Sequence, residues 1–273
     1  MDLESQQKKA TALRADVVRM LYTCQSGHPG GSLSLVEIMM ALYYNVARVD
    51  PKNPRSEDRD RIVLSKGHGC PTQYAILADL GFFPREDLWT LRQLHSHLQG
   101  HPDFRKTPGI DVNSGSLGQG ISIAVGLALA AKYLKKDYKV YTIIGDGEMQ
   151  EGQIWEAAQS AAKYQLDNFI VMLDYNHLQI DGTNDEVMPL GDTCAKFAAF
   201  GFDTATVDGH DIQALTAALQ APATPGKPRY LCCDTVKGKG VSFMENQVGW
   251  HGKPMNKAEY EQAMKELGVQ VNG

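Results

Sequence analysis

Short apolar runs that alternate with amphipathic segments are the feature that most restricts the fold of this chain. The runs have the length and the branched or aromatic side chains of strands, and the segments between many of them carry apolar residues three and four positions apart. Strands that alternate with helices form βαβ units, which build a mostly parallel sheet with helices on both faces. We therefore predict an α/β fold. The expected strands are 61–65, 139–146, 168–176, 202–209 and 229–236.

The helical segments are recognised by their start signals and their spacing. Residues 34–47 begin at Ser34, which predicts an N-cap, and Glu37 stands three residues on, where a capping box places it. Residues 117–134 are apolar almost throughout, which predicts a long central helix. The expected helices are 4–25, 34–47, 117–134 and 149–165.

The composition fits one domain and excludes several classes of protein. The chain has 273 residues, 43% of them hydrophobic, and residues 1–273 contain no internal repeat or credible linker, so we predict a single domain. The net charge of −5, with both signs scattered, is unlike the basic stripe of a nucleic-acid binder. The start lacks an apolar signal region, and no run approaches the length of a membrane span. The five cysteines form no C-x-x-C pair, which indicates a reduced, cytoplasmic protein.

Asp146 is a carboxylate between two glycines at the end of an expected strand. Asn176 ends the next strand, 30 residues on, so both side chains reach the crevice at the carboxyl ends of the strands. Oxygen ligands from Asp and Asn suit Mg²⁺, and the carbonyl of Leu178 can supply a third oxygen, with phosphate oxygens and water completing the shell. Gly147 leads into a helix, whose free N–H groups favour an anion, and bare glycines let a diphosphate approach the backbone. Alone, however, the G-D-G string is more often a simple strand-end turn.

Several motifs in a fixed order identify the chain as a member of a family. The pattern G-D-G-x-x-x-E-G, a helix, a strand and then N-x-x-x-x-D-G resembles the thiamine-diphosphate motif in its transketolase form. Further blocks that resemble transketolase are SGHPGGSLS, LSKGHG, LQGHPD, SGSLGQG, DGHD and HGKP. The resemblance covers nearly the whole chain and implies the diphosphate-binding domain of a thiamine-diphosphate enzyme. The Gly-rich stretch 237–256, which contains the last block, is a long loop of the kind that is usually functional.

The resemblance implies a role for each matching residue. The metal, Mg²⁺ with Ca²⁺ or Mn²⁺ as substitutes, would be bound by Asp146, Asn176 and the carbonyl of Leu178. Thiamine diphosphate would be bound by His68, Gly115, Ser116, Leu117, Gly145, Asp146, Gly147, Glu148, Asn176 and His251. The catalytic residues, which would face the hydroxyl and carbonyl oxygens of the substrate, are His28, His101 and His251.

The resemblance also implies a partner chain. A full transketolase has a pyrimidine-binding domain, with a glutamate that activates the cofactor, and a third, C-terminal domain, and neither matches any part of residues 1–273. The expected partner is a C-terminal transketolase subunit that carries the pyrimidine-binding domain, in an assembly with two copies of each chain. The assembly would transfer a two-carbon ketol unit from a ketose phosphate to an aldose phosphate.

Other functions and sites stay open at this point. A deoxyxylulose-phosphate synthase-like or 2-oxoacid dehydrogenase-like enzyme shares G-D-G and the Asn, although SGHPGG and LQGHPD favour ketose substrates. A third possibility is a non-catalytic module that binds thiamine diphosphate. The presence of His28 and His101 argues against it, because a module that only binds the cofactor does not need them. His95 and His97, close to His101, raise the hypothesis of a zinc site, which we rank below ordinary polar positions. We interpret His210, in DGHD, as a surface turn residue.

Overall fold

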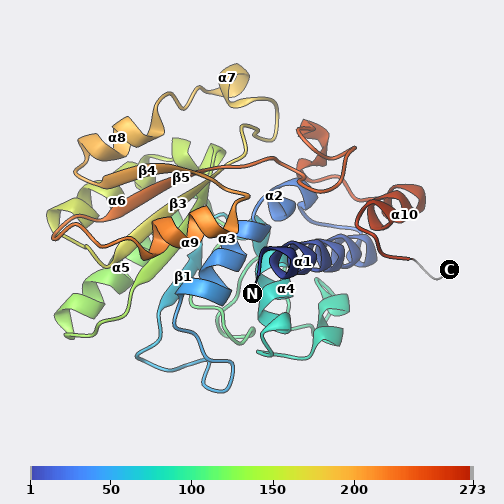
Figure 1. Ribbon diagram of the computed structural model, residues 1–273, viewed down its shortest axis with the longest axis horizontal. Helices are drawn as coiled ribbons and strands as arrows, with labels where there is room; N and C mark the ends of the chain where they lie inside the picture. The colour runs from blue at the N-terminus through green and yellow to red at the C-terminus, as the bar shows by residue number, and fades with distance from the viewer. Residues whose placement is uncertain (1, 271–273) are drawn as a thin grey trace.

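Among residues 2–270, which the computed structural model describes, five strands form one sheet in the order β1-β2-β3-β5-β4 (Figure 1). All neighbouring strands are parallel. The strands are β1 (Arg61–Leu64), β2 (Val140–Gly145), β3 (Phe169–Tyr175), β4 (Asp203–Asp208) and β5 (Arg229–Asp234). Each lies inside one of the predicted runs, so the predicted α/β fold with a parallel sheet is confirmed.

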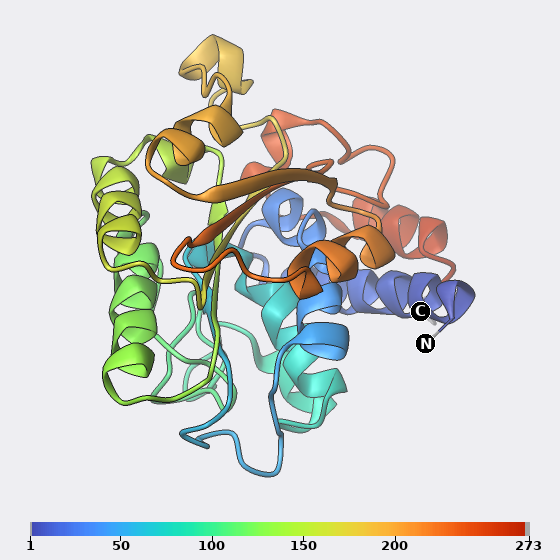
Figure 2. The same ribbon diagram turned by 60° about the vertical axis from the view of Figure 1, so that its left-hand side comes forward.

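Alternation along the strands divides the buried side chains between two cores. In β1, Ile62 and Leu64 face one core while Val63 faces the other, and β2, β3 and β5 divide in the same way. The edge strand β4 contributes Val207 to the first core and is otherwise partly exposed. Both faces of the sheet are therefore apolar, as a parallel sheet covered on two sides requires. Figure 2 shows the sheet between the two groups of helices. The first face carries α1 (Leu3–Cys24), α3 (Val36–Met40), α4 (Cys70–Asp79) and α9 (Ile212–Gln220), and the second carries α5 (Gln119–Tyr133), α6 (Gly152–Lys163) and α8 (Thr193–Ala199).

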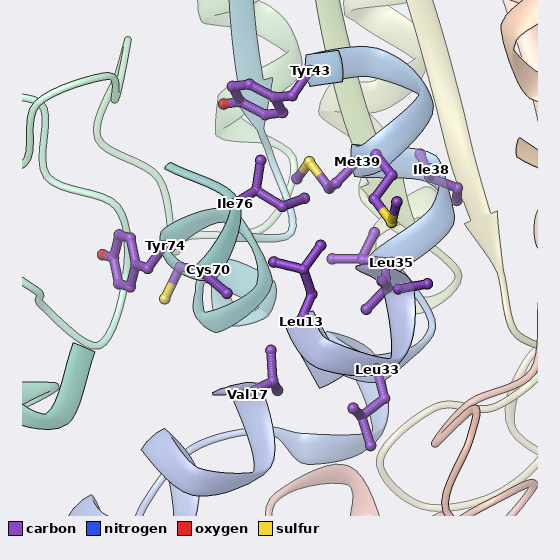
Figure 3. Close-up of a cluster of buried hydrophobic side chains, with 14 of the residues drawn as sticks. Leu13, Val17, Leu33, Leu35, Ile38, Met39, Tyr43, Cys70, Tyr74 and Ile76 are labelled. Atoms are coloured by element: carbon purple, nitrogen blue, oxygen red, sulfur yellow. The ribbon is translucent and has the colours of Figure 1, made fainter. Parts of the chain in front are cut away.

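The centre of the first core is a contact between three helices (Figure 3). Leu13 of α1, Ile38 of α3 and Ile76 of α4 are buried there, each with no more than 1% of its surface exposed. Truncating a side chain of this kind to alanine typically destabilises a protein by about 2–5 kcal/mol. This core therefore joins the N-terminal helices to the sheet edge at which β1 lies.

The predicted helix 34–47 differs from the structure in how it begins. A separate short helix, α2 (Pro29–Leu33), precedes α3, and α3 continues into a π-helical turn, Ala41–Val46. The predicted capping box is wrong, because the Ser34 hydroxyl donates to the Asp174 carboxylate at 2.6 Å and the Glu37 carboxylate binds Arg14. Both side chains meet buried partners from distant parts of the chain, and these contacts outweigh local capping.

The C-terminal part of the chain closes the fold beside α1. Helix α10 (Lys257–Glu266) starts with a capping box between Asn256 and Glu259, and it packs on α1 through stacked rings of Tyr22 and Tyr260, whose centroids lie 4.0 Å apart. The Gly-rich stretch before it contains a 3-10 turn, Val248–His251, which returns to the carboxyl ends of the strands. No helix within residues 2–270 is both long and apolar enough to cross a bilayer.

Candidate active site

A cavity of about 380 Å³ lies at the carboxyl ends of β1, β2 and β3. Segments that are far apart in the sequence meet there, since parallel strands all end at the same edge of the sheet. Most of the residues predicted to bind or react lie in its wall. The predicted residues that line it are His28, His68, His101, Gly115, Leu117, Gly145, Asp146, Gly147, Glu148, Asn176, Leu178 and His251. Ser116, also predicted, is exposed and lies outside this lining.

Asp146 is buried without a hydrogen-bond partner. Its residue surface is 3% exposed, and neither carboxylate oxygen forms a hydrogen bond. Burial, together with the charge of Asp174, raises the pKa of Asp146 to about 8, while the Asn184 amide lies close enough to lower it in part without hydrogen-bonding geometry. A buried carboxylate is stable only when a proton or a cation compensates it. The two free oxygens therefore fit the donor set of a hard divalent cation.

Asn176 and Leu178 present further oxygen atoms to the same cavity. The Asn176 side-chain oxygen accepts a hydrogen bond from the Leu178 N–H at 3.3 Å, which orients the amide. The Leu178 carbonyl accepts from the Lys237 ammonium at 3.2 Å. The carbonyl predicted to bind a metal thus already faces a positive charge, and the three predicted ligands lie in one wall of the cavity.

Two buried lysines that the sequence analysis did not single out also line the cavity. Lys66 follows β1 and is 1% exposed, and its ammonium contacts the Asp174 carboxylate at 2.6 Å and the Gly31 carbonyl at 3.1 Å. Lys237 follows β5 and is 2% exposed. Burial, and then the nearby charge of Lys66, lower the pKa of Lys237 to about 8. Each lysine follows a strand and stands directly before a glycine. This pattern is the sequence signal by which both could have been recognised as site residues.

Asp174 is a buried acid inside β3 that organises this wall. Its carboxylate accepts hydrogen bonds from Ser34, Lys66 and Thr235, each at 2.6 Å. Burial alone would raise its pKa, but Lys66 and the hydroxyl donors hold the pKa of Asp174 below its ordinary value. Asp174 is therefore an anion bonded within the protein, whereas Asp146 remains available to a ligand.

Three histidine rings lie together at one side of the cavity. The ring centroids are 5.0 Å apart for His28 and His68, 5.2 Å for His28 and His251, and 5.4 Å for His68 and His251. Burial and neighbouring positive charges lower the pKa of His28 to about 4 and that of His251 to about 3, and they hold the pKa of His68 well below its ordinary value. The rings are thus neutral near pH 7, and each presents one nitrogen that can donate and one that can accept a hydrogen bond.

His101 belongs to the same wall. Burial, and the Arg92 guanidinium, lower the pKa of His101. Its ring packs against Gly115, where a Cβ would lie 3.0 Å from the imidazole Cγ and the backbone has φ +142°. A side chain at that position would displace the imidazole, so this glycine is needed to place His101.

Gly145 and Gly147 meet no such obstacle within the protein. A Cβ at Gly145 would lie 3.4 Å from Lys66, and one at Gly147 would lie 3.4 Å from the Gln179 side chain, both close to ordinary contact distances. Internal packing therefore does not require glycine on either side of Asp146. The open space beside the backbone is consistent with a ligand that approaches it.

Glu148 uses its carboxylate within the protein. The two oxygens accept from the backbone N–H of Gly118 at 2.9 Å, from that of Gly145 at 3.1 Å, and from the Ser65 hydroxyl. These contacts fasten the start of α5 to the end of β2. Glu148 lines the cavity, but its role here is to hold the backbone that surrounds Asp146.

The histidines of the zinc hypothesis do not converge. His97 contacts the Asp87 carboxylate at 3.0 Å and packs its ring on Phe83, while His101 lines the cavity. Within residues 2–270 no three His, Cys, Asp or Glu side chains gather as a metal site. The interpretation of His210 as a surface turn residue is wrong, because its ring is half-buried and bonded to Glu37.

The fold and this wall together define an α/β domain whose cavity presents oxygen donors and positive charges where the parallel strands end. The carboxyl ends of the parallel strands bring together a free carboxylate, an amide, two buried ammonium groups and open glycines. The chain matches the family described as the thiamine diphosphate binding domain of transketolase over residues 5–272, and it belongs to that family. The family resemblance inferred from the sequence is confirmed.

Two relatives that the chain matches over nearly their whole length are named as transketolase subunits. The chain is 44% identical to a 6-deoxy-6-sulfo-D-fructose transketolase subunit of Clostridium sp. (strain MSTE9) over 262 residues, which are 96% of this chain and 95% of that protein. It is 40% identical to an apulose-4-phosphate transketolase subunit of Phocaeicola vulgatus over 272 residues, 99% of this chain and 96% of that one.

A solved transketolase has the same fold over part of its length. The crystal structure of transketolase from Campylobacter jejuni superimposes with a TM-score of 0.92 at 34% identity, covering 100% of this chain and 44% of that one. The chain thus spans less than half of that transketolase and nearly all of the relatives named as subunits.

Proposed function

We propose that the chain is the thiamine-diphosphate-binding subunit of a two-subunit transketolase. The observation that carries the proposal is the unpartnered carboxylate of Asp146, buried in the same cavity wall as Asn176 and Leu178. The family match and the relatives that are subunits of transketolases support it.

The residues of the cavity fit a divalent metal and a diphosphate. Asp146, Asn176 and the Leu178 carbonyl would hold Mg²⁺, or Ca²⁺ or Mn²⁺ in its place, since these are hard oxygen donors. Lys66 and Lys237 would offset the negative charge of the diphosphate. Gly145 and Gly147 leave the backbone open on the same side.

The histidines would serve the substrate. Bound thiamine diphosphate supplies the carbon that attacks a ketose carbonyl and carries the two-carbon unit. His28, His101 and His251 are neutral and face the cavity, so they can donate hydrogen bonds to substrate oxygens and exchange protons with them. His68, Gly115 and Leu117 would line the cofactor, with Ser116 at its rim.

The acid that activates the cofactor would come from a partner. Among residues 2–270, the acids that line the cavity are Asp146, Glu148 and Asp181. Asp146 is assigned to the metal, Glu148 is bonded to backbone N–H groups, and Asp181 is exposed and is not a glutamate. We therefore assign the activating glutamate to a C-terminal transketolase subunit. We expect two copies of each chain, since soluble oligomers favour closed two-fold symmetry.

The reaction we propose is transfer of a ketol unit from a ketose phosphate to an aldose phosphate. The relatives from Clostridium and Phocaeicola are named for different anionic ketoses, a sulfofructose and a ketose phosphate, which supports an anionic ketose as donor. We place the assembly in the cytoplasm, in keeping with five cysteines that are all unpaired.

Turnover with and without the partner tests the proposal. The purified chain with Mg²⁺ and thiamine diphosphate should transfer little or no ketol unit, and adding the partner chain should restore transfer at equal site concentration. Pyruvate as donor serves as the control and should give no turnover. Equal rates in the presence and absence of the partner would show that the activating acid lies within this chain, and the two-subunit proposal would be wrong.

A further inference from the structure

The segment Thr235–Gly240 follows β5 and carries Lys237 into the cavity. Main-chain bonds hold its backbone, among them Gly238 N–H to the Gly30 carbonyl at 3.0 Å and Asn246 N–H to the Lys237 carbonyl at 2.9 Å. Side chains hold it as well, and two of these contacts flank Lys237. The Val236 N–H donates to Nε2 of His210 at 2.8 Å, and the Lys239 carbonyl accepts from Nε of Arg14 at 2.8 Å. Two of the contacts that position Lys237 therefore come from side chains that do not line the cavity.

Glu37 joins these two side chains. Its oxygens accept from Nη1 and Nη2 of Arg14, both at 2.7 Å, and from the His210 ring at 2.9 Å. Glu37 is 6% exposed and Arg14 is 5% exposed. Burial alone would raise the pKa of Glu37, but His210 and Arg14 lower it to about 2, so the carboxylate is an anion at neutral pH. The cluster links α1, α3 and the turn between β4 and α9 to the segment that carries Lys237.

The partners of His210 determine which ring nitrogen carries the proton. A backbone N–H can only donate, so Nε2 of His210 must accept from Val236 and carry no proton. The Glu37 carboxylate can only accept, so Nδ1 carries the proton. Around the ring, the Asp208 carboxylate binds the backbone N–H of His210 at 2.8 Å, and a shallow pocket beside it is also lined by Asp234 and Lys239.

The same segment has little freedom to adjust if its contacts are lost. Gly238 has φ +81°, and a Cβ there would lie 2.4 Å from the Met244 carbonyl oxygen. Gly240 has φ +91°, and a Cβ there would lie 2.7 Å from Cδ of Arg14. The backbone thus passes in close contact with its neighbours on both sides of Lys239, and a shift at Val236 must be passed on to Lys237.

We propose that His210 is a positioning residue for Lys237. Held by Glu37, the neutral imidazole helps to fix the backbone at Val236 and so to aim the Lys237 ammonium. The ammonium lies 3.1 Å from Nδ1 of His251 and 3.2 and 3.3 Å from the Leu178 and Gln179 carbonyls, where the diphosphate would lie. This inference rests on the proposed function, because it takes Lys237 to neutralise the diphosphate. His210 touches neither cofactor nor substrate and acts only through the lysine.

A double-mutant cycle in the assembled enzyme tests the inference. The measurement is the thiamine-diphosphate Kd at saturating Mg²⁺ for the wild type, His210→Phe, Lys237→Met and the double variant. His210→Phe should weaken binding about tenfold, as expected when a buried hydrogen bond and an aimed charge are both lost. In the Lys237→Met background the same substitution should have no further effect, because its route to the cofactor is gone.

Conservative variants separate positioning from a general effect on folding. His210→Gln keeps an acceptor for the Val236 N–H and should restore most of the lost affinity, whereas His210→Asn, which is too short to reach Val236, should not. If His210→Phe does not fold, the comparison of the Gln and Asn variants still tests the positioning role. The matched control is His97→Phe, which removes another half-buried histidine bonded to a carboxylate and should leave the Kd unchanged.

Each alternative outcome has a distinct meaning. Additive losses for His210→Phe and Lys237→Met, or equal affinities for the Gln and Asn variants, would overturn the positioning role. An unchanged Kd in Lys237→Met would overturn it as well, while leaving the proposed function intact if Asp146→Ala still abolishes binding. A wild-type assembly that binds no thiamine diphosphate would instead refute the proposed function.

Discussion

Asp146, the proposed metal ligand, is a buried carboxylate without a hydrogen-bond partner, and this costs the fold stability. Its pKa in the folded chain is raised from an ordinary value of 3.8 to about 8, mainly by burial and then by Asp174. Below the pKa that Asp146 has in the unfolded chain, the residue is protonated in both states, so its burial does not lower the free energy of unfolding through ionisation. As the pH rises from that value to about 8, the unfolded chain releases this proton more readily than the folded one, so stability is lost progressively.

The variant Asp146→Asn should therefore stabilise the metal-free chain while abolishing its function. Thermal unfolding followed by circular dichroism should show a gain of several degrees at about pH 8, which fades as the pH falls below about 4, where the wild-type acid becomes protonated in both states. Calorimetry of the assembled enzyme should show loss of Mg²⁺-dependent thiamine-diphosphate binding. The exposed acid Asp185, changed to Asn, is the control. Unchanged cofactor affinity in Asp146→Asn would refute the metal assignment.

His101 should act on the substrate and not on the cofactor. Its ring is neutral near pH 7 because burial and Arg92 lower its pKa, so it can take up and return a proton. We expect His101→Ala to lower kcat/KM by about 100-fold and to leave the thiamine-diphosphate Kd near the wild-type value. His95→Ala, which removes an exposed histidine of the same loop, should have little effect. A weakened Kd with normal turnover would reverse the assignment.

The residues of the site differ in how well the sequence predicts them. His68, Asp146 and Asn176 follow closely after strands, and parallel strands bring such residues to one edge, so their convergence was predictable. The ion pair of Lys66 with Asp174 was not predictable, because it joins residues 108 positions apart, although Lys66 itself stands before a glycine after a strand. The role of His210 was missed for the same reason, since its partner Glu37 lies on another element.

At the scale of elements, the strands were predictable and the helices only in part. Apolar runs mark β2 and β3 clearly, because a strand buried on both faces has few polar positions to blur the pattern. The order of the strands was not predictable, since β5 lies between β3 and β4 and periodicity does not encode neighbours. Short helices such as α2 and α7 (Asn184–Val187) are too brief to show a period.

Two glycines of α5 should respond in opposite ways to alanine. A Cβ at Gly120 would lie 2.7 Å from the Cα of Ser65, so Gly120→Ala should push α5 away from the end of β1 and destabilise the chain by about 1–3 kcal/mol. Gly126 is exposed and a Cβ there meets nothing within 4 Å, so Gly126→Ala should stabilise the helix by about 0.5–1 kcal/mol. Urea unfolding of the isolated chain measures both. Equal effects would show that α5 does not pack on β1 as described.

At the scale of the whole molecule, cofactor binding should be linked to assembly with the partner. If the cofactor is enclosed between two chains, it stabilises the complex by mass action, by about 2.7 kcal/mol at a concentration 100 times its Kd. Thiamine diphosphate with Mg²⁺ should thus raise the Tm of the mixed subunits clearly and that of this chain alone much less. Thiamine without its diphosphate is the control. An equal rise for the chain alone would argue against a shared site.

The strand order also has a consequence for how the chain folds during synthesis. Strands β1, β2 and β3 pair with one another and are complete by Tyr175, whereas β4 pairs only with β5 in the part of the chain that the structure describes. The edge of β3 therefore stays unpaired until β5 has been made. β5 ends at Asp234 and must insert between β3 and β4, which are both made before it. While the ribosome is still translating residues 176–228, that open edge is a surface on which nascent chains can associate wrongly. Slow elongation over this interval should therefore favour aggregation of nascent chains and lower the yield of folded protein.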